Sequence, residues 1–191
     1  AEFLNDDAAD VRVAAVLALS RLGVQDSSTA IAKLLEDPDE HVRNEATLAL
    51  GRLGSKAHAA GIAERLRDDS DEVRSSAVFV LGHLGAKEQG PRIAKMLQDQ
   101  DFQTCHFALH ALGRLGAKDQ IPEIAEFLAD PDSVARGSAA MALAWLEARD
   151  KAPVIVTLLT DSTPYDRQGA VLALGRLGVK EDEDVLKALG F

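Results

Sequence analysis

The sequence is poor in the residues that mark secreted, membrane and nucleic-acid-binding proteins. Its 191 residues include one cysteine, so no disulfide forms within the chain, which favours a reducing compartment such as the cytoplasm. No apolar run approaches the roughly 18 residues that a membrane-spanning helix needs. Lys and Arg total 21 against 31 Asp and Glu, which gives a net charge of -10. We therefore expect neither nucleic acid nor an anionic membrane surface as a partner.

Aromatic residues are also scarce, at 4%, whereas hydrophobic residues reach 47% and are mostly Ala and Leu. The leucines follow a fixed period of 31 residues, at Leu22, Leu53, Leu84, Leu115, Leu146 and Leu177. Such a period is typical of a stacked solenoid, in which each unit buries its apolar face against its neighbours. We predict an all-α fold that forms a single domain over residues 1–191, with repeats at about 6–36, 37–67, 68–98, 99–129, 130–160 and 161–191.

One repeat, residues 37–67, shows how the unit is built. Turn and cap residues around Pro38 open it, and an apolar stripe at helical spacing follows from Val42 to Leu53. Gly54 stands where a left-handed residue ends a helix, and a second apolar stripe precedes the next turn. The pattern predicts twelve helices in six antiparallel pairs.

Both ends of the chain stop within a repeat. Residues 1–4 match the tail of a second helix at 125–128, and residues 189–191 end where the other repeats reach their acidic turn. We expect the chain to be part of a longer array, because neither end has the polar outer face of a capping repeat.

The repeat motif resembles the HEAT-like repeats of phycobilisome lyases, over essentially the whole chain. The residues that carry the resemblance in the second repeat are Asp37, Arg43, Ala46, Leu50, Gly51, Leu53 and Gly54. It implies a right-handed α-α superhelix. It also implies a structural ladder of hydrogen-bonded Asp and Arg residues between successive repeats: Asp6 and Arg12, Asp37 and Arg43, Asp68 and Arg74, Asp130 and Arg136, and Asp161 and Arg167. The fourth repeat keeps Asp99 but has Cys105 in place of arginine, which predicts a weak seam.

Three functional branches of this family make different demands on the sequence. Deoxyhypusine hydroxylases place His-Glu pairs after the ladder arginine as iron ligands, and this chain has no His-Glu pair. DNA glycosylases of this fold line their groove with basic residues, which the acidic composition disfavours. Phycobilin lyase subunits remain an alternative, although no residue here singles out a bilin site.

One group of residues looks like metal ligands or a nucleophile. His106 and His110 lie four residues apart on one helix face, a spacing that suits zinc, but Cys105 points away from His106 and no carboxylate stands at a matching offset. Cys105 has no orienting group or oxyanion donor in the pattern. We expect no metal, no cofactor and no catalytic residue, and interpret His110 as a half-buried side chain.

Charge alternates between the two kinds of turn. Acidic residues precede the first helices, and basic residues such as Arg21, Arg52 and Lys56 follow them. These rows could serve a charged partner or, as the ordinary alternative, suit each helix dipole.

Residues that break the period are candidates for function. The breaks gather in repeats four and five, and the residues that we expect to form one surface region there are Phe107, His110, Met141 and Trp145. Trp145 occupies a slot that is Arg or His in the other repeats, and an exposed Trp is typical of a binding hot spot. The alternative is that Trp145 folds back over a neighbouring helix.

The sequence as a whole favours a non-catalytic scaffold or adaptor for a protein partner, with a phycobilin-lyase-like chromophore-handling subunit as the alternative. The resemblance places the second helices on the concave side. Their outward slots in the central repeats, which vary as a binding surface should, are Arg92, Lys95, Glu123, Glu126 and Val154.

Overall fold

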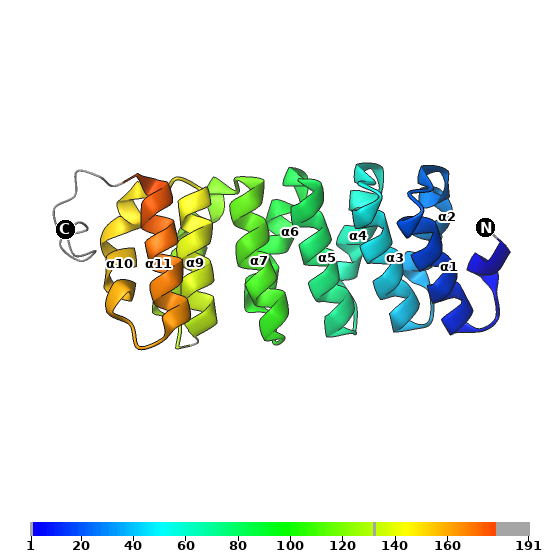
Figure 1. Cartoon of the computed structure of the whole chain (residues 1–191), viewed down its shortest axis with the longest axis horizontal. Coiled ribbons are helices and arrows are strands. Elements are labelled where there is room, and N and C mark those ends of the chain that lie inside the picture. Colours follow the sequence, from blue (N-terminus) through cyan, green and yellow to red (C-terminus); the bar gives the residue numbers. More distant parts are fainter. Residues whose placement is uncertain (1, 132, 179–191) are drawn as a thin grey trace. The chain divides into compact units, whose positions relative to one another are not determined.

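The computed structural model of the chain describes residues 2–131 and 133–178, and these residues form helices and turns without a strand. The helices follow one another as a series of antiparallel pairs (Figure 1). The predicted last helix, with Leu186, and the basic turn residue Lys180 lie outside the described residues. None of the helices in the described ranges is both long and apolar enough to cross a membrane.

The first helix of each repeat is a regular α-helix of three to four turns. These helices are α1 (Ala9–Arg21), α3 (Glu40–Arg52), α5 (Asp71–Leu84), α7 (Phe102–Leu115), α9 (Ser133–Trp145) and α11 (Pro164–Leu177). Their inward slots hold small or aliphatic side chains, and Ala46, Ala77, Ala108, Ala139 and Ala170 are completely buried. Small side chains in this slot let neighbouring first helices approach closely.

The second helices are shorter than the sequence pattern predicts. They are α2 (Ser28–Lys33), α4 (Ala59–Glu64), α6 (Gly90–Ala94), α8 (Ile121–Glu126) and α10 (Ala152–Thr157), and each continues at both ends into a turn of 3₁₀-helix. The apolar stripe survives this change, because Ile31, Ile62, Ile93, Ile124 and Ile155 are completely buried. The apolar stripe therefore predicts where the second helices lie, but it does not predict that both of their ends are 3₁₀-helix.

A left-handed residue follows most first helices, as the glycine pattern predicts. Gly54 has a φ of 63°, a conformation that costs glycine little. The fifth repeat has Glu147 in this slot, and Glu147 adopts a φ of 60° all the same. Because a side chain with a Cβ is strained there, the fifth repeat keeps the shape of the turn at an energetic cost.

Contacts between elements divide the chain into two compact units, Ala1–Phe107 and Ala108–Phe191. We call their described parts the first unit (2–107) and the second unit (108–178). The boundary lies within α7, two residues after Cys105, the residue that replaces the ladder arginine. The prediction of one continuous six-repeat domain stays a prediction.

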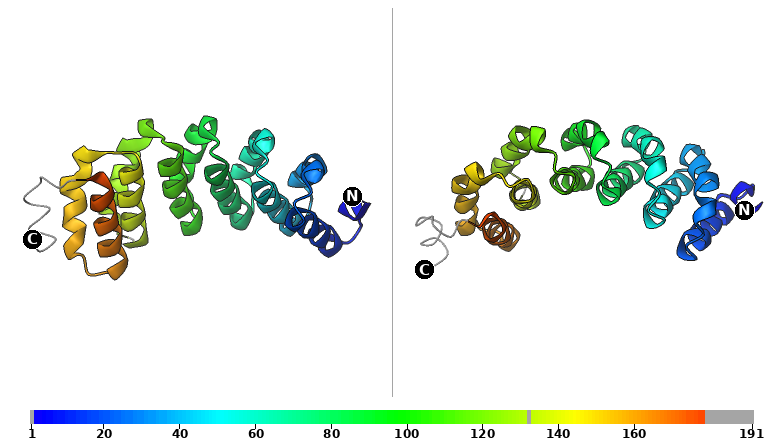
Figure 2. Two further views of the ribbon diagram at one scale, coloured as in Figure 1. Left: turned by 45° about the horizontal axis from the view of Figure 1, so that its top comes forward. Right: turned by 90° about the horizontal axis from the view of Figure 1, so that it is seen from above.

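Within the first unit, the first helices α1, α3 and α5 lie on the inner side of the curve and the second helices on the outer side (Figure 2, right). The prediction that second helices line a concave side is therefore wrong for this unit. The physical reason is the close packing of successive first helices, since a Cβ on Gly51 of α3 would lie 2.9 Å from Val80 of α5. Arg92 belongs to the second helix α6, and Lys95 directly follows that helix.

Candidate binding surface on the first helices

The Asp and Arg residues of the motif form a repeated bidentate contact in the first unit. Arg43 donates from Nε and Nη2 to the two carboxylate oxygens of Asp68 in the next repeat, at 2.8 and 2.7 Å. Its Nη1 donates to the carbonyls of Asp37 and Pro38, in the turn that opens its own repeat. Arg12 with Asp37 and Arg74 with Asp99 repeat this geometry. Each arginine therefore ties one turn to the next.

We call each of these contacts between a motif arginine and the aspartate of the next repeat a rung. The carboxylates of the rungs are held in their charged form. Burial by itself would raise the pKa of Asp68, but hydrogen bonds from Arg43 and from the Ser70 N–H outweigh it, and the pKa lies below its usual value. The pKa of Asp99 is lowered against the same effect of burial, by Arg74 and the Asp101 N–H. These charges are committed to the fold and are not available to a partner.

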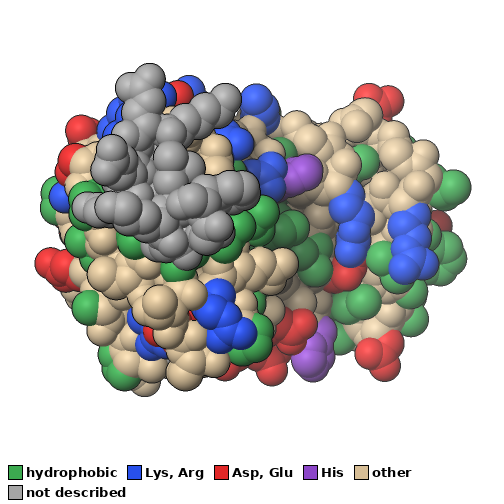
Figure 3. Space-filling view, turned by 60° about the vertical axis from the view of Figure 1, so that its left-hand side comes forward, with side chains coloured by type: hydrophobic (Ala, Val, Ile, Leu, Met, Phe, Trp, Pro, Cys, Tyr) green, Lys and Arg blue, Asp and Glu red, His purple; other side chains and the backbone are tan. Residues whose placement is uncertain are grey.

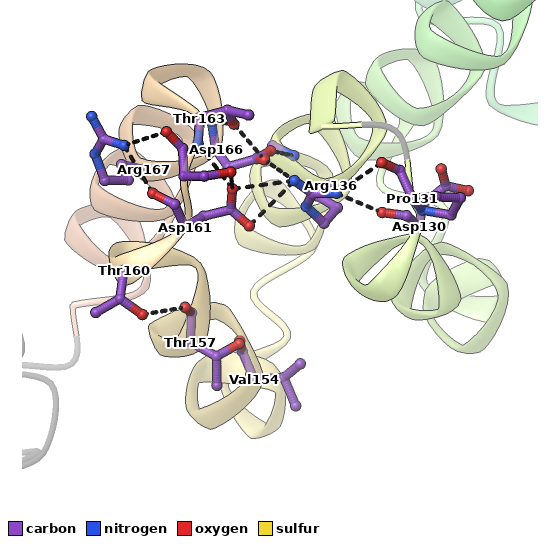
Figure 4. A network of polar contacts seen from close by, with 12 residues as sticks. Asp130, Pro131, Arg136, Val154, Thr157, Thr160, Asp161, Thr163, Asp166 and Arg167 are labelled. Carbon is purple, nitrogen blue, oxygen red and sulfur yellow. Dashed lines mark hydrogen bonds and ion pairs between the residues drawn. The ribbon is translucent and has the colours of Figure 1, made fainter.

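Arg136, in the second unit, makes a different rung (Figure 4). Its Nη1 donates to the carbonyls of Asp130 and Pro131, as in the other repeats. Its Nη2 donates to Asp166 at 2.5 Å and to Asp161 at 3.2 Å, and Nε has no hydrogen-bond partner among the described residues. Asp166 is completely buried and also accepts from the Thr163 hydroxyl and the Gly137 N–H. In the last described repeat, Arg167 bonds the carbonyls of Asp161 and Ser162.

Cys105 occupies the arginine slot of the fourth repeat. Its thiol is buried and donates to the Leu97 carbonyl at 3.3 Å, within the first unit. A thiol offers one weak donor where a guanidinium offers five, so this slot lacks the bidentate contact made at Arg43. The weak seam stays a prediction.

The acidic turns before the first helices are also largely structural. Asp37 and Asp68 are rung partners, and Asp39 accepts hydrogen bonds from the His41 and Val42 N–H groups at the start of α3. This use favours the ordinary interpretation of the acidic row, in which each carboxylate satisfies its own helix or rung.

The histidines near Cys105 pack against aromatic rings. The His106 ring stacks on that of Phe102, with centroids 6.2 Å apart, and is tilted against that of Phe107, with centroids 5.8 Å apart. Among the residues that the structure describes, no group of three or more His, Cys, Asp or Glu side chains is placed to hold a metal ion. The arrangement supports a packing role for His106.

The predicted binding residues of the second helices are on the surface. Lys95, Glu123, Glu126 and Val154 are exposed, whereas Arg92 is half-buried and donates to Glu64 at 2.9 Å. They belong to three repeats, with Arg92 and Lys95 in the first unit and Glu123, Glu126 and Val154 in the second. Their role in binding stays a prediction.

Trp145 is half-buried, so the expectation that it is substantially exposed is wrong. Its ring lies edge-on to His110, with centroids 5.3 Å apart, and a Cβ on Gly113 of α7 would lie 2.7 Å from the indole. The indole therefore covers the glycine of the preceding first helix. Met141 is half-buried one turn earlier. Phe107 belongs to the first unit, so the four-residue surface region stays a prediction.

The predictions from the sequence omit an exposed aromatic side chain on a first helix of the first unit. Phe79 on α5 is 47% exposed and contacts the ring of Phe107 at a centroid distance of 5.6 Å. Its slot holds Leu in three other repeats, so the residue type alone does not mark it as a break in the period. The available signal was the coincidence of Phe79 with His83, which replaces arginine in the neighbouring slot. A groove of about 300 Å³ lies beside Phe79, lined by Leu48, Gly51, Arg52, Phe79, Val80 and His83.

A family model for HEAT repeats matches residues 1–77, 59–144 and 121–190. The chain belongs to the HEAT repeat family. No curated protein matches it in sequence. Solved structures are similar to this chain in fold. A chain of the complex of CpcE and CpcF of phycocyanin lyase from Nostoc sp. PCC7120 is 27% identical, with a TM-score of 0.74, and the match covers 93% of this chain and 75% of that one.

Two further structures show the same fold at lower identity. The YIBA protein of Escherichia coli is 21% identical with a TM-score of 0.71, and the match covers 98% of this chain and 72% of that one. A designed armadillo repeat protein in complex with the peptide (KR)4 is 19% identical with a TM-score of 0.67, covering 92% and 97%. The HEAT-like repeat architecture predicted from the motif is thereby confirmed.

Proposed function

We propose that this chain is a non-catalytic scaffold that binds a protein partner through the first helices of the first unit. The observation that carries the proposal is the exposed Phe79 beside a groove on that face. Exposed aromatic side chains next to a groove are typical anchors of protein interfaces. The polar residues of the repeat motif are engaged in rungs and helix caps, which supports binding rather than catalysis.

The proposed partner is a protein, because the net charge of -10 disfavours nucleic acid and anionic lipid surfaces. A reducing, cytoplasmic setting accords with the single, buried cysteine. The outward residues of α8 and α10, including Glu126 and Val154, form a second surface of the proposed scaffold.

Affinity capture with the purified chain tests the proposal, with Phe79→Ser as the sensitive variant. Leu172→Ser is the matched control, because Leu172 fills the same repeat slot in the second unit and is 53% exposed. We expect a protein partner whose recovery falls with Phe79→Ser and not with Leu172→Ser. Equal recovery with all three proteins would contradict a binding role for this face.

A second candidate function is a chromophore-handling subunit like those of phycobilin lyases. The similarity to the CpcE and CpcF complex, at 27% identity over 93% of the chain, favours it. Mixing the purified chain with a bilin separates the two proposals. A new absorption band or fluorescence on mixing supports the lyase-like function, whereas a protein complex that forms without any absorbing molecule supports the scaffold.

A further inference from the structure

The groove between α3 and α5 lies beside the close approach of these two helices at Gly51. A Cβ on Gly51 would lie 2.9 Å from Val80, so the glycine permits this approach. Leu48 and Phe79 form the apolar walls, and the volume is about 300 Å³. That volume is at the lower end of ligand sites, a size that suits one large side chain.

The rings of Phe79 and His83 line this groove, and the Phe107 ring contacts Phe79. The Phe79 ring lies 6.3 Å from the His83 ring and 5.6 Å from the Phe107 ring, centroid to centroid. Phe79 leaves 47% of its surface in water although Leu48, its counterpart on α3, is half-buried. An inserted apolar side chain would cover this surface and gain the free energy of its burial.

The polar residues that line the groove are Arg52 and His83, with no carboxylate among its lining residues, in a protein with a net charge of -10. Arg21, Arg52 and His83 occupy the same slot of three successive repeats, at the ends of α1, α3 and α5, and Arg21 and His83 are exposed. Arg52 donates to Glu45 and to the Ser20 hydroxyl, which positions its guanidinium at the groove. Figure 3 shows Lys, Arg and His side chains beside apolar ones on the surface.

We propose that this groove binds an acidic peptide segment of the partner by inserting one phenylalanine or leucine side chain beside Phe79. The carboxylates that flank the inserted side chain would lie along Arg21, Arg52 and His83. Charge complementarity selects this occupant, because a basic segment would meet the same row with repulsion. The inference rests on the proposed scaffold function and adds the chemical class of the segment that it recognises.

The test uses a short fluorescein-labelled peptide with one central phenylalanine flanked by glutamates, and fluorescence anisotropy with the full chain. Saturable binding is expected that weakens as salt rises. Replacing the peptide's phenylalanine by alanine, or Phe79→Ser in the protein, should weaken binding at least about tenfold. Arg52→Gln should weaken it about two- to fivefold.

Two matched variants control for position in the repeat. Leu172→Ser and Arg176→Gln alter the same slots as Phe79 and Arg52 in the second unit, and both should leave the affinity unchanged. Circular dichroism checks that every variant is folded. Phe79→Leu, which supplies the residue found at Leu48, keeps the apolar wall and should bind more tightly than Phe79→Ser.

Three results would overturn the inference: no saturable binding of the acidic peptide, equal binding of a version with lysines in place of glutamates, or equal losses in the control variants. The scaffold proposal has its own readout, the captured protein. A partner whose recovery depends on Phe79 while the acidic peptide fails to bind would overturn the acidic-segment inference and leave the scaffold standing. A bilin that binds and displaces the peptide would instead assign the groove to the chromophore.

Discussion

The rung at Arg43 and the rung at Arg136 begin from the same motif and end in different structures. Arg43 donates from both Nε and Nη2 to the carboxylate of Asp68. Arg136 divides one nitrogen between Asp161 and the buried Asp166, and its Nε is left without a partner. The motif residues are the same, so the difference lies in their neighbours.

Asp166 is the neighbour that changes the second rung. Its slot is valine in the first three repeats, where Val42 and Val73 are completely buried. α9 and α11 approach so closely that a Cβ on Gly169 would lie 2.9 Å from the backbone of Gly137. This approach places the carboxylate where Arg136 and the Gly137 N–H can reach it. One substitution in the core can thus redirect a structural arginine.

The largest effect that we predict separates the two rungs. Arg136→Ala should cost about 3–5 kcal/mol in the free energy of unfolding, because it leaves the carboxylate of Asp166 buried beside too few donors. Asp166→Val restores the residue of the first repeats and frees Arg136 to pair fully with Asp161. It should cost less than about 1 kcal/mol. Urea unfolding of both variants makes the comparison, and equal losses would show that Asp166 does not redirect Arg136.

The regular rung should give an intermediate effect. Arg43→Ala leaves Asp68 with the backbone N–H of Ser70 as a donor and with the Arg65 guanidinium 3.5 Å away, and it should cost roughly 1–3 kcal/mol. Thermal unfolding measures it, with the exposed Arg67→Ala as the control for loss of a surface arginine. An unchanged unfolding midpoint in Arg43→Ala would show that this rung does not stabilise the fold.

A smaller effect, of opposite sign, is expected where the fifth repeat departs from glycine. Glu147→Gly should stabilise the chain by about 1 kcal/mol, since it relieves the left-handed conformation. The ion pair that it removes, Glu147 with Lys118 at 3.5 Å, is exposed on both sides and contributes little. A lowered unfolding midpoint would mean that the glutamate makes a contribution that the strain argument omits.

The smallest effect concerns acid. The folded pKa values of Asp68 and Asp99 are lowered, so the stability that these groups contribute is fully present above their unfolded pKa of about 3.9. It is lost as the pH falls through the lower folded values. Urea midpoints between pH 5 and pH 3 should therefore fall less in Asp68→Asn than in the unmodified chain. An equal fall in both proteins would contradict the assignment.

The fold was accessible from the sequence because the repeat constrains it many times over. The leucine and alanine slots locate each first helix, and Gly54 marks its end. Within the first unit, the prediction of which helices lie on the inner side was wrong, because the closeness of first-helix packing depends on contacts such as Gly51 with Val80 rather than on any single repeat. A pattern within one repeat does not contain the spacing between repeats.

The candidate site was predicted less well, for a related reason. Sequence reasoning looked for residues that break the period and selected Trp145, which turned out to cover Gly113. Phe79 is a conservative change in an apolar slot, and its exposure identifies it more clearly than the neighbouring change to His83 does. The signal at Asp166 was visible as a charge in a valine slot, but its partner Arg136 could be assigned only from the packing of α9 on α11.

The claim that arginine rungs couple successive repeats is tested most directly by native-state hydrogen exchange in the unmodified chain and in Cys105→Arg. In the unmodified chain, amides of α3 and α5 should exchange with an opening free energy different from that of amides in α9 and α11, because the arginine is missing from the repeat between them. In Cys105→Arg the two values should converge. A single opening free energy across these four helices, unchanged in Cys105→Arg, would contradict the account.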